Sequence, residues 1–229
     1  MLAKICSLAL QLETLVSRFD LVIFDCDGVL VDSERITNRI YCAMLNDLGL
    51  QLSLDDMFEK FVGRASSQNL ALITEMLGKA PPEDFFPAYQ QRAWQALKEE
   101  VTAVPGVQAL LDSIEQPVAV ASSGEMEKMH VTLGRSRLLP YFEGRIFSVR
   151  DVENPKPAPD LYLLAASTLG VAPERCAVVE DTITGVTAGN AAGMHVFGFT
   201  DHTAAERLIE AGATETFADM LQLAERLRY

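Results

Sequence analysis

The sequence predicts an α/β fold: a doubly wound parallel sheet with an all-helical domain inserted after the first strand. Three observations predict it. Short apolar runs recur along the chain, helical patterns separate them, and one long stretch lacks strand patterns. Runs that are apolar on both faces are typical of strands buried inside a parallel sheet, and the helical stretches between them supply the crossovers.

The predicted strands are the apolar runs themselves. Proline marks the start of two of the intervening helices, in Pro105-Gly106 and Pro159-Asp160, because its fixed backbone angle suits the first helical turn. In chain order, the strand candidates are residues 21–24, 118–121, 146–149, 177–179 and 196–199.

Residues 33–104 break this alternation, because they show helical periodicity and no convincing strand. Ile40, Met44 and Leu48 share one helical face, and glycine and proline positions divide the stretch into about four helices. An insert of about seventy residues is too long for a simple crossover. We therefore expect two domains, a core made of residues 1–32 and 105–229 and a helical domain made of residues 33–104.

Composition and charge narrow the classes of partner. The chain has 229 residues, of which 49% are hydrophobic, and a net charge of −13. Nucleic acids and anionic membranes are polyanions, so we expect this acidic chain to bind neither. A small phosphorylated substrate is compatible with the charge, because a metal ion and a few cations reverse the field locally.

The cysteines and the N-terminal segment indicate a cytoplasmic protein. Cys6, Cys26, Cys42 and Cys176 lie far apart without a CxxC pair, which is typical of free thiols in a reducing compartment. Residues 1–18 contain a short apolar stretch but no small-residue cleavage site. We expect a short amphipathic helix, or a start codon placed too early, rather than a signal peptide. No apolar run in the sequence approaches the length needed to span a bilayer.

The most informative motif is Asp25-Cys26-Asp27-Gly28, which directly follows the first predicted strand. Side chains alternate along a strand, so Asp25 and Asp27 are expected to point the same way. Two such carboxylates repel each other unless a cation lies between them, and a carboxylate pair with a hard divalent ion suits chemistry on phosphate. Taken alone, the motif is equally consistent with an acidic loop after a core strand.

Polar residues of the kind found in active sites lie at the ends of two other predicted strands and in the segment between those strands. Ser122 and Ser123 end one predicted strand, Glu180 and Asp181 end another, and Lys156 lies between prolines in the segment linking them. Ligands collect at the carboxyl ends of parallel strands. Individually, the serine or aspartate can be a helix cap and the lysine a solvated surface residue. Together they predict one site containing carboxylates, a rigidly held ammonium and hydroxyl groups.

This ordered set of motifs resembles the haloacid dehalogenase-like hydrolase superfamily, in its phosphatase and phosphomutase branch. The resemblance covers about residues 19–229 and includes all four motifs of the family, in Asp25-Cys26-Asp27-Gly28, Ser122, Lys156 and Glu180-Asp181. It implies a Rossmann-like core and a mobile helical cap formed by residues 33–104.

The same resemblance implies a role for each residue. Asp25 is expected to be the nucleophile and Asp27 the general acid and base. Asp25, the Asp27 backbone carbonyl and Asp181 are expected to bind Mg²⁺, with Glu180 close behind them. The phosphoryl group is expected to be held by Lys156, Ser122 and Ser123.

The expected activity is Mg²⁺-dependent hydrolysis of a small phosphorylated metabolite through an aspartyl-phosphate. The first motif is most similar to that of bacterial sugar phosphatases, which implies a sugar phosphate or sugar-acid phosphate such as 6-phosphogluconate or phosphoglycolate. Arg64 is the candidate cap residue for a second anionic group of the substrate, and a solvated loop arginine is the alternative. We expect a monomer or weak dimer.

Two alternatives remain at this stage. The first is a phosphomutase of the β-phosphoglucomutase type, which carries a cap histidine ten residues after its acid/base aspartate. Here that position is Thr37, and the arginine of the mutase specificity loop aligns near Ser66. Both departures favour a phosphatase. The second is a catalytically idle binding protein, which predicts loss of motif carboxylates, and none is missing.

Overall fold

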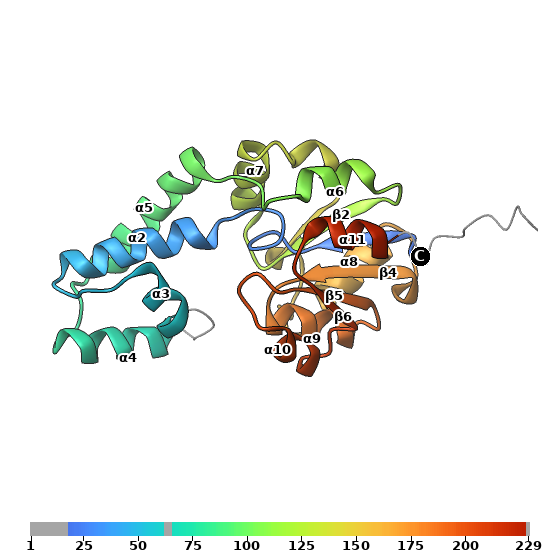
Figure 1. Cartoon of the computed structure of the whole chain (residues 1–229). Coiled ribbons are helices and arrows are strands. Elements are labelled where there is room, and N and C mark those ends of the chain that lie inside the picture. Colours follow the sequence, from blue (N-terminus) through green and yellow to red (C-terminus); the bar gives the residue numbers. More distant parts are fainter. Residues whose placement is uncertain (1–17, 62–65, 228–229) are drawn as a thin grey trace, which may run out of the picture.

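The structure is a computed structural model, and it describes residues 18–61 and 66–227. Within these ranges, six parallel strands form one sheet in the order β3-β2-β1-β4-β5-β6 (Figure 1). This arrangement confirms the doubly wound parallel sheet expected from the sequence. The strands are β1 (Leu21–Phe24), β2 (Val118–Ser122), β3 (Ile146–Ser148), β4 (Cys176–Glu180), β5 (His195–Phe199) and β6 (Glu215–Phe217).

The first five strands match the apolar runs, whereas the edge strand β6 was not predicted. Its three residues begin with Glu215 and Thr216, which are only partly buried. An edge strand has one unpaired side, so it needs no continuous apolar run. The hydrophobic pattern therefore gives no signal for it.

Helices cover both faces of the sheet, and strand residues alternate between the two cores. Phe24 and Val179 belong to one buried cluster, while Ile23 and Val178 belong to the other, as the two-residue repeat of a strand requires. The first cluster contains residues of α6 (Val107–Ser113), α7 (Met126–Arg135) and α11 (Met220–Arg226), and the second contains residues of α8 (Asp160–Thr168), α9 (Ile183–Ala191) and α10 (Ala205–Glu210). Short 3₁₀ turns lie at Leu139–Phe142, Val149–Asp151 and Pro173–Arg175.

The insert after β1 forms a separate helical layer, which lies to one side of the sheet in Figure 1. It has its own core, in which Tyr41, Leu45, Met57 and Phe85 are buried together. Its described helices are α2 (Glu34–Asp47), α3 (Leu54–Lys60), α4 (Ser66–Leu77) and α5 (Phe85–Glu100).

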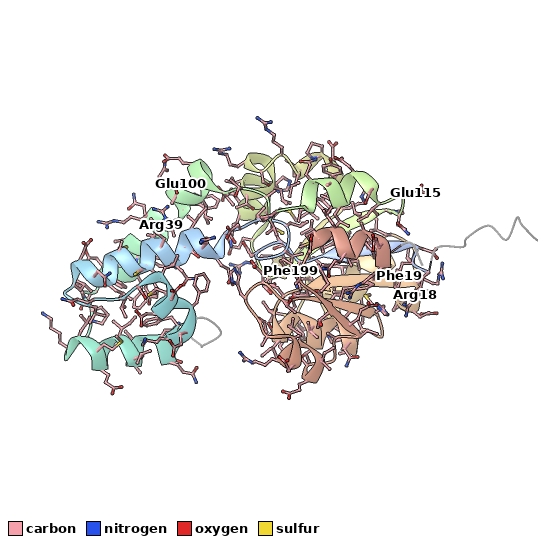
Figure 2. All side chains as sticks on the ribbon, in the orientation of Figure 1. Arg18, Phe19, Arg39, Glu100, Glu115 and Phe199 are labelled. Atoms are coloured by element: carbon pink, nitrogen blue, oxygen red, sulfur yellow. The ribbon has the colours of Figure 1, made fainter. Side chains whose placement is uncertain are left out.

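Two adjacent chain segments connect this helical layer to the sheet. Val31 and Ala103 form an antiparallel bridge, and the Val104 N–H donates to the Leu30 carbonyl over 3.0 Å. These paired extended segments are a suitable hinge, and Arg135 of α7 adds a contact between the layers by donating to the Glu99 carbonyl of α5 over 2.8 Å. An exposed ion pair between Arg39 of α2 and Glu100 of α5, both labelled in Figure 2, joins the two helices that leave the hinge.

The described part of the chain contains no helix that is both long and apolar enough to cross a membrane.

The strand order indicates where a ligand binds. From β1 the chain builds the sheet outward through β2 and β3, and then returns to add β4 on the other side of β1. Ligands bind outside the carboxyl ends of the strands at such a switch point, which places the expected site after β1 and β4.

Candidate active site

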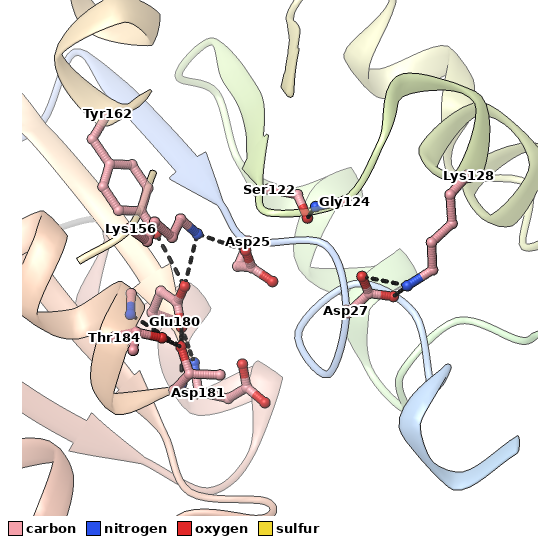
Figure 3. A network of polar contacts seen from close by, with 12 residues as sticks. Asp25, Asp27, Ser122, Gly124, Lys128, Lys156, Tyr162, Glu180, Asp181 and Thr184 are labelled. Atoms are coloured by element: carbon pink, nitrogen blue, oxygen red, sulfur yellow. Dashed lines mark hydrogen bonds and ion pairs between the residues drawn. The ribbon is translucent and has the colours of Figure 1, made fainter. Parts of the chain in front are cut away.

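Asp25 lies at the switch point, one residue beyond β1. Its N–H donates to the Val179 carbonyl of β4 over 2.9 Å, so the sheet ladder continues to this residue and fixes its backbone. The residue is only 7% exposed, and one carboxylate oxygen accepts a hydrogen bond of 2.6 Å from the Lys156 ammonium (Figure 3). The structure therefore brings together two of the predicted catalytic residues.

Lys156 is held by two carboxylates and an aromatic ring. Its Nζ donates to Asp25 Oδ1 over 2.6 Å and to Glu180 Oε1 over 2.8 Å, and it lies 4.6 Å from the centre of the Tyr162 ring. Burial alone lowers the pKa of this ammonium, but the attraction of Asp25 and Glu180 outweighs burial and leaves the pKa well above its ordinary value. The two carboxylates therefore stabilise the charged form of Lys156, which contacts Asp25 just beyond the carboxyl end of β1.

Glu180 positions Lys156 and has its own oxygens fully occupied. Oε1 accepts from Lys156 and, over 3.2 Å, from the Tyr162 hydroxyl. Oε2 accepts from the Asp181 and Thr182 N–H groups and from the Thr182 hydroxyl, at 2.8–2.9 Å. A Cβ on Gly185 would lie 1.6 Å from Oε1, so only glycine in α9 leaves room for this arrangement. These contacts place Glu180 behind the site, next to the residues that face it.

Asp181 is buried and incompletely paired. It is 2% exposed, and no described residue forms a hydrogen bond with its Oδ1. Its Oδ2 faces the backbone of Gly28, where a Cβ would lie 2.2 Å away; Gly28 also adopts a positive φ of 81°. Glycine is required there for both reasons, and the motif loop can then pass directly against Asp181.

A cation would stabilise the ionised forms of the Asp25 and Asp181 carboxylates. Burial, helped by repulsion from Glu180, outweighs the attraction of Lys156 and raises the pKa of Asp25 to about 7. Burial, followed by repulsion from Glu180 and Asp25, raises the pKa of Asp181 well above its ordinary value. Both carboxylates are thus costly to ionise without a positive ligand, and the free Oδ1 of Asp181 is an acceptor still available to one.

The predicted Mg²⁺ ligands fit this electrostatic pattern. Within the described residues, no three His, Cys, Asp or Glu side chains are grouped as a ready metal site. The expected Mg²⁺ ligands include only two such side chains, those of Asp25 and Asp181, and the third ligand is the backbone carbonyl of Asp27. Mg²⁺ typically binds through one or two carboxylates and keeps several waters. The donor set therefore suits Mg²⁺ better than an ion that requires an all-protein cage.

Ser122 is the last residue of β2, the strand that pairs with β1 on the side opposite β4, and Ser123 follows it. Ser122 is buried, and its Oγ accepts a 3.0 Å hydrogen bond from the Gly124 N–H, whereas Ser123 is exposed. The Gly124 carbonyl accepts from Ser148 of β3 over 2.8 Å, so two strands fix this turn. Hydroxyl and N–H groups at a strand end before a helix are suited to an anion.

The family model for haloacid dehalogenase-like hydrolases matches residues 19–193. The chain belongs to the haloacid dehalogenase-like hydrolases. The resemblance expected from the sequence is therefore confirmed, and the protein is an enzyme of the hydrolase class.

Individual members of the family match most of the chain. The 6-phosphogluconate phosphatase of Escherichia coli K12 is 34% identical over 92% of this chain and 95% of its own length. Hexitol phosphatase A of the same organism is 33% identical over 76% of this chain and 80% of its own length. A haloacid dehalogenase family hydrolase from Deinococcus radiodurans R1, crystallised with phosphate and sodium, superimposes with a TM-score of 0.82 at 34% identity, covering 90% of this chain and 94% of that one.

Lys128 is a site residue that the family motifs did not predict. Its ammonium contacts both carboxylate oxygens of Asp27 at 2.8 Å. The sequence contained one signal: Lys128 lies in the first turn of α7, where the helix dipole disfavours a cation. A residue that violates a local preference often serves a functional site. Arg64, the predicted cap residue for a second anion, lies outside the described residues.

Proposed function

We propose that this haloacid dehalogenase-like hydrolase is a Mg²⁺-dependent phosphatase that acts on a small phosphorylated carbohydrate through an aspartyl-phosphate. One observation carries the proposal. Asp25 is buried beside Lys156 at the switch point of the sheet, while Asp27, two residues later, is held separately by Lys128. The two carboxylates of one motif therefore have different environments, which suits two different roles.

In the proposed reaction, Asp25 is the nucleophile. A carboxylate oxygen forms a bond to phosphorus as the bond from phosphorus to the leaving alkoxide breaks, and Asp27 gives its proton to that alkoxide. Water then attacks phosphorus, Asp27 takes a proton from it, and the bond between phosphorus and Asp25 breaks. Inorganic phosphate leaves, and both carboxylates return to their starting states.

The remaining residues bind and orient the phosphoryl group. Lys156 and the Ser122 and Ser123 strand end supply positive charge and hydrogen-bond donors, and positioning of this kind carries most of the catalysis in phosphoryl transfer. When bound by Asp25, Asp181 and the Asp27 carbonyl, Mg²⁺ would supply further neutralisation of phosphoryl charge.

The substrate class rests on the relatives. The 6-phosphogluconate phosphatase and hexitol phosphatase A act, by name, on phosphorylated sugar acids and sugar alcohols, and both match across most of this chain. We extend this class to the present protein as a sugar phosphate or sugar-acid phosphate. Residues 33–104 are proposed to form the cap that selects among such substrates, and Arg64 to bind a second anionic group.

A substrate screen tests this proposal. The purified enzyme is incubated with about one hundred phosphorylated metabolites and Mg²⁺, and phosphate release is measured. We expect at least one sugar or sugar-acid phosphate to reach a kcat/KM of about 10⁴ M⁻¹s⁻¹ or more, within the range of natural enzyme–substrate pairs. Phosphate release from none of them, or release unchanged after exhaustive chelation, would refute the proposed activity.

A further inference from the structure

The Asp27 carboxylate is held from two sides by residues of different layers. Lys128, from α7 of the core, donates to Oδ1 and Oδ2 over 2.8 Å each. Ser33, at the hinge before α2, donates to Oδ1 through its hydroxyl. Figure 3 shows Asp27 turned toward Lys128, while Asp25 faces Lys156 on the opposite side.

These contacts leave one oxygen of Asp27 with free acceptor capacity. An ionised carboxylate has about four acceptor positions, two on each oxygen. Among the residues that the structure describes, Lys128 occupies one on each oxygen and Ser33 a second on Oδ1, so Oδ2 keeps one. A Cβ on Gly124 would lie 3.7 Å from this Oδ2 and 3.4 Å from the Ser122 hydroxyl. The less occupied oxygen therefore faces the strand end proposed to bind phosphate.

Lys128 occupies a helix position that is unfavourable for a positive charge. It lies in the first turn of α7, where the helix dipole is unfavourable to a cation, and its side chain is only 32% exposed. Its backbone carbonyl accepts from the Thr132 hydroxyl over 3.0 Å, which ties this turn to the next one. Both side chains of this pair are partly buried, at 32% and 25% exposed, so the contact holds the Asp27 carboxylate in one place.

We propose that Lys128 is a positioning residue for Asp27 and that it presents Oδ2 as the atom that exchanges the proton. Asp27 gives a proton from Oδ2 to the leaving alkoxide and later takes one from the attacking water at the same atom. The ammonium contacts both oxygens, so it fixes the plane of the carboxylate. This inference rests on the acid/base role of Asp27 in the proposed function.

The proposal predicts different effects on the two halves of the reaction. An alkyl leaving group needs the proton of Asp27, whereas p-nitrophenolate is a stable anion and leaves without it. Every substrate needs Asp27 as the base for the attacking water. Loss of Lys128 should therefore slow both steps for a sugar phosphate, but only the second step for p-nitrophenyl phosphate.

The test compares Lys128→Met, Lys128→Arg and Lys60→Met in steady-state and rapid-mixing assays with Mg²⁺. Lys60 is the control, because it forms a similar ion pair with Asp56 and its side chain is 38% exposed. For Lys128→Met we expect kcat on a sugar phosphate to fall about 100-fold, the cost typical of a misplaced catalytic group, with KM changed less than about twofold. With p-nitrophenyl phosphate we expect a burst of about one p-nitrophenolate per active site, followed by slow turnover.

The controls separate this role from others. Lys128→Arg can still contact both oxygens and should recover at least about a tenth of the lost rate, and Lys60→Met should match the unmodified enzyme. A raised KM with unchanged kcat would overturn the proposal by making Lys128 a substrate ligand. A loss without a burst, or no rescue by a folded Lys128→Arg, would overturn it as well. Asp27→Asn is measured in parallel: if it retains full activity, the acid/base role itself is wrong, whatever Lys128 does.

Discussion

Asp25 and Asp27 belong to one motif, but their surroundings give them different chemistry. Asp25 is buried at the switch point of the sheet and contacts Lys156, which Glu180 holds in turn. Asp27 is about a quarter exposed at its side chain and pairs with Lys128. A nucleophile must be fixed, whereas an acid/base group must reach both the leaving oxygen and water.

The first residue-scale prediction concerns the nucleophile. Asp25→Asn should reduce kcat by several orders of magnitude, because an amide does not attack phosphorus and is a poor Mg²⁺ ligand. The fold should persist, since Lys156 keeps its contact with Glu180. Phosphate release and circular dichroism measure the two effects. A variant that keeps more than about a tenth of the kcat would exclude Asp25 as the nucleophile.

The second residue-scale prediction concerns pH and Mg²⁺. Without metal, the pKa of Asp25 is raised from 3.8 to about 7 in the folded protein. Between these pH values the unfolded chain binds fewer protons than the folded one, so the stability of the metal-free protein should fall as pH rises through this window. Mg²⁺ requires ionised ligands, so it should raise the Tm by a few degrees at about pH 8 and hardly at all at about pH 5.

Asp181→Asn is the matching control for that measurement. It removes a proposed ligand whose pKa is also raised by burial, and it should abolish the Tm rise at the higher pH. An equal Mg²⁺ effect at both pH values, or one that survives in Asp181→Asn, would contradict the proposed ligands.

At the scale of elements, the junction of β4 and α9 determines the position of Lys156. Gly185 lies in the first turn of α9, and a Cβ there would overlap Glu180, which is buried and fully hydrogen-bonded. Replacing glycine by alanine inside a helix normally stabilises a protein. Here the overlap must displace Glu180, and with it Lys156.

Gly185→Ala should therefore destabilise the protein by about 1–3 kcal/mol, the usual cost of overpacking, and lower kcat. Gly134→Ala is the matched control, because Gly134 lies in α7 and a Cβ there would have its nearest neighbouring atom 3.9 Å away. This control should be neutral or slightly stabilising. Urea denaturation and phosphate release measure both variants. Equal stabilities for the two would show that Glu180 moves without cost.

Sequence and structure agree best where strand ends meet. Asp25, Glu180 and Asp181 could be placed together because parallel strands end at one edge of a sheet, and Lys156 because its motif resembled a family. Lys128 could not be placed, since its partner Asp27 lies 101 positions away and no pattern links them. Similarly, β6 was missed because a short, partly polar edge strand lacks an apolar run.

At the scale of the whole molecule, the helical layer contacts the core at the hinge, through Arg135 and the Glu99 carbonyl of α5, and through α3. Phe58 of α3 stacks on His202, in the loop after β5, with ring centres 4.9 Å apart. Ser33, beside the hinge, contacts Asp27. Movement of the helical layer would therefore act directly on the proposed acid/base residue.

Contacts between the helical layer and Asp27 also affect whether the enzyme hydrolyses or isomerises its substrate. A mutase-type cap has a histidine at the position of Thr37, whereas the Thr37 hydroxyl donates to the Ser33 and Glu34 carbonyls of its own helix. It offers no basic group to control Asp27. With β-glucose 1-phosphate and a bisphosphate primer, we expect free phosphate and little glucose 6-phosphate. An excess of glucose 6-phosphate would show a phosphomutase.

In the proposed mechanism, phosphate passes through a covalent bond to Asp25. The most direct measurement is an acid quench of Asp27→Asn with p-nitrophenyl phosphate and Mg²⁺, followed by mass spectrometry of the peptide containing residues 21–33. Because this variant keeps the nucleophile but lacks the base for water, we expect the phosphorylated peptide to accumulate with the phosphate on Asp25. Release of p-nitrophenolate without any phosphorylated peptide, or phosphate on another residue, would contradict it.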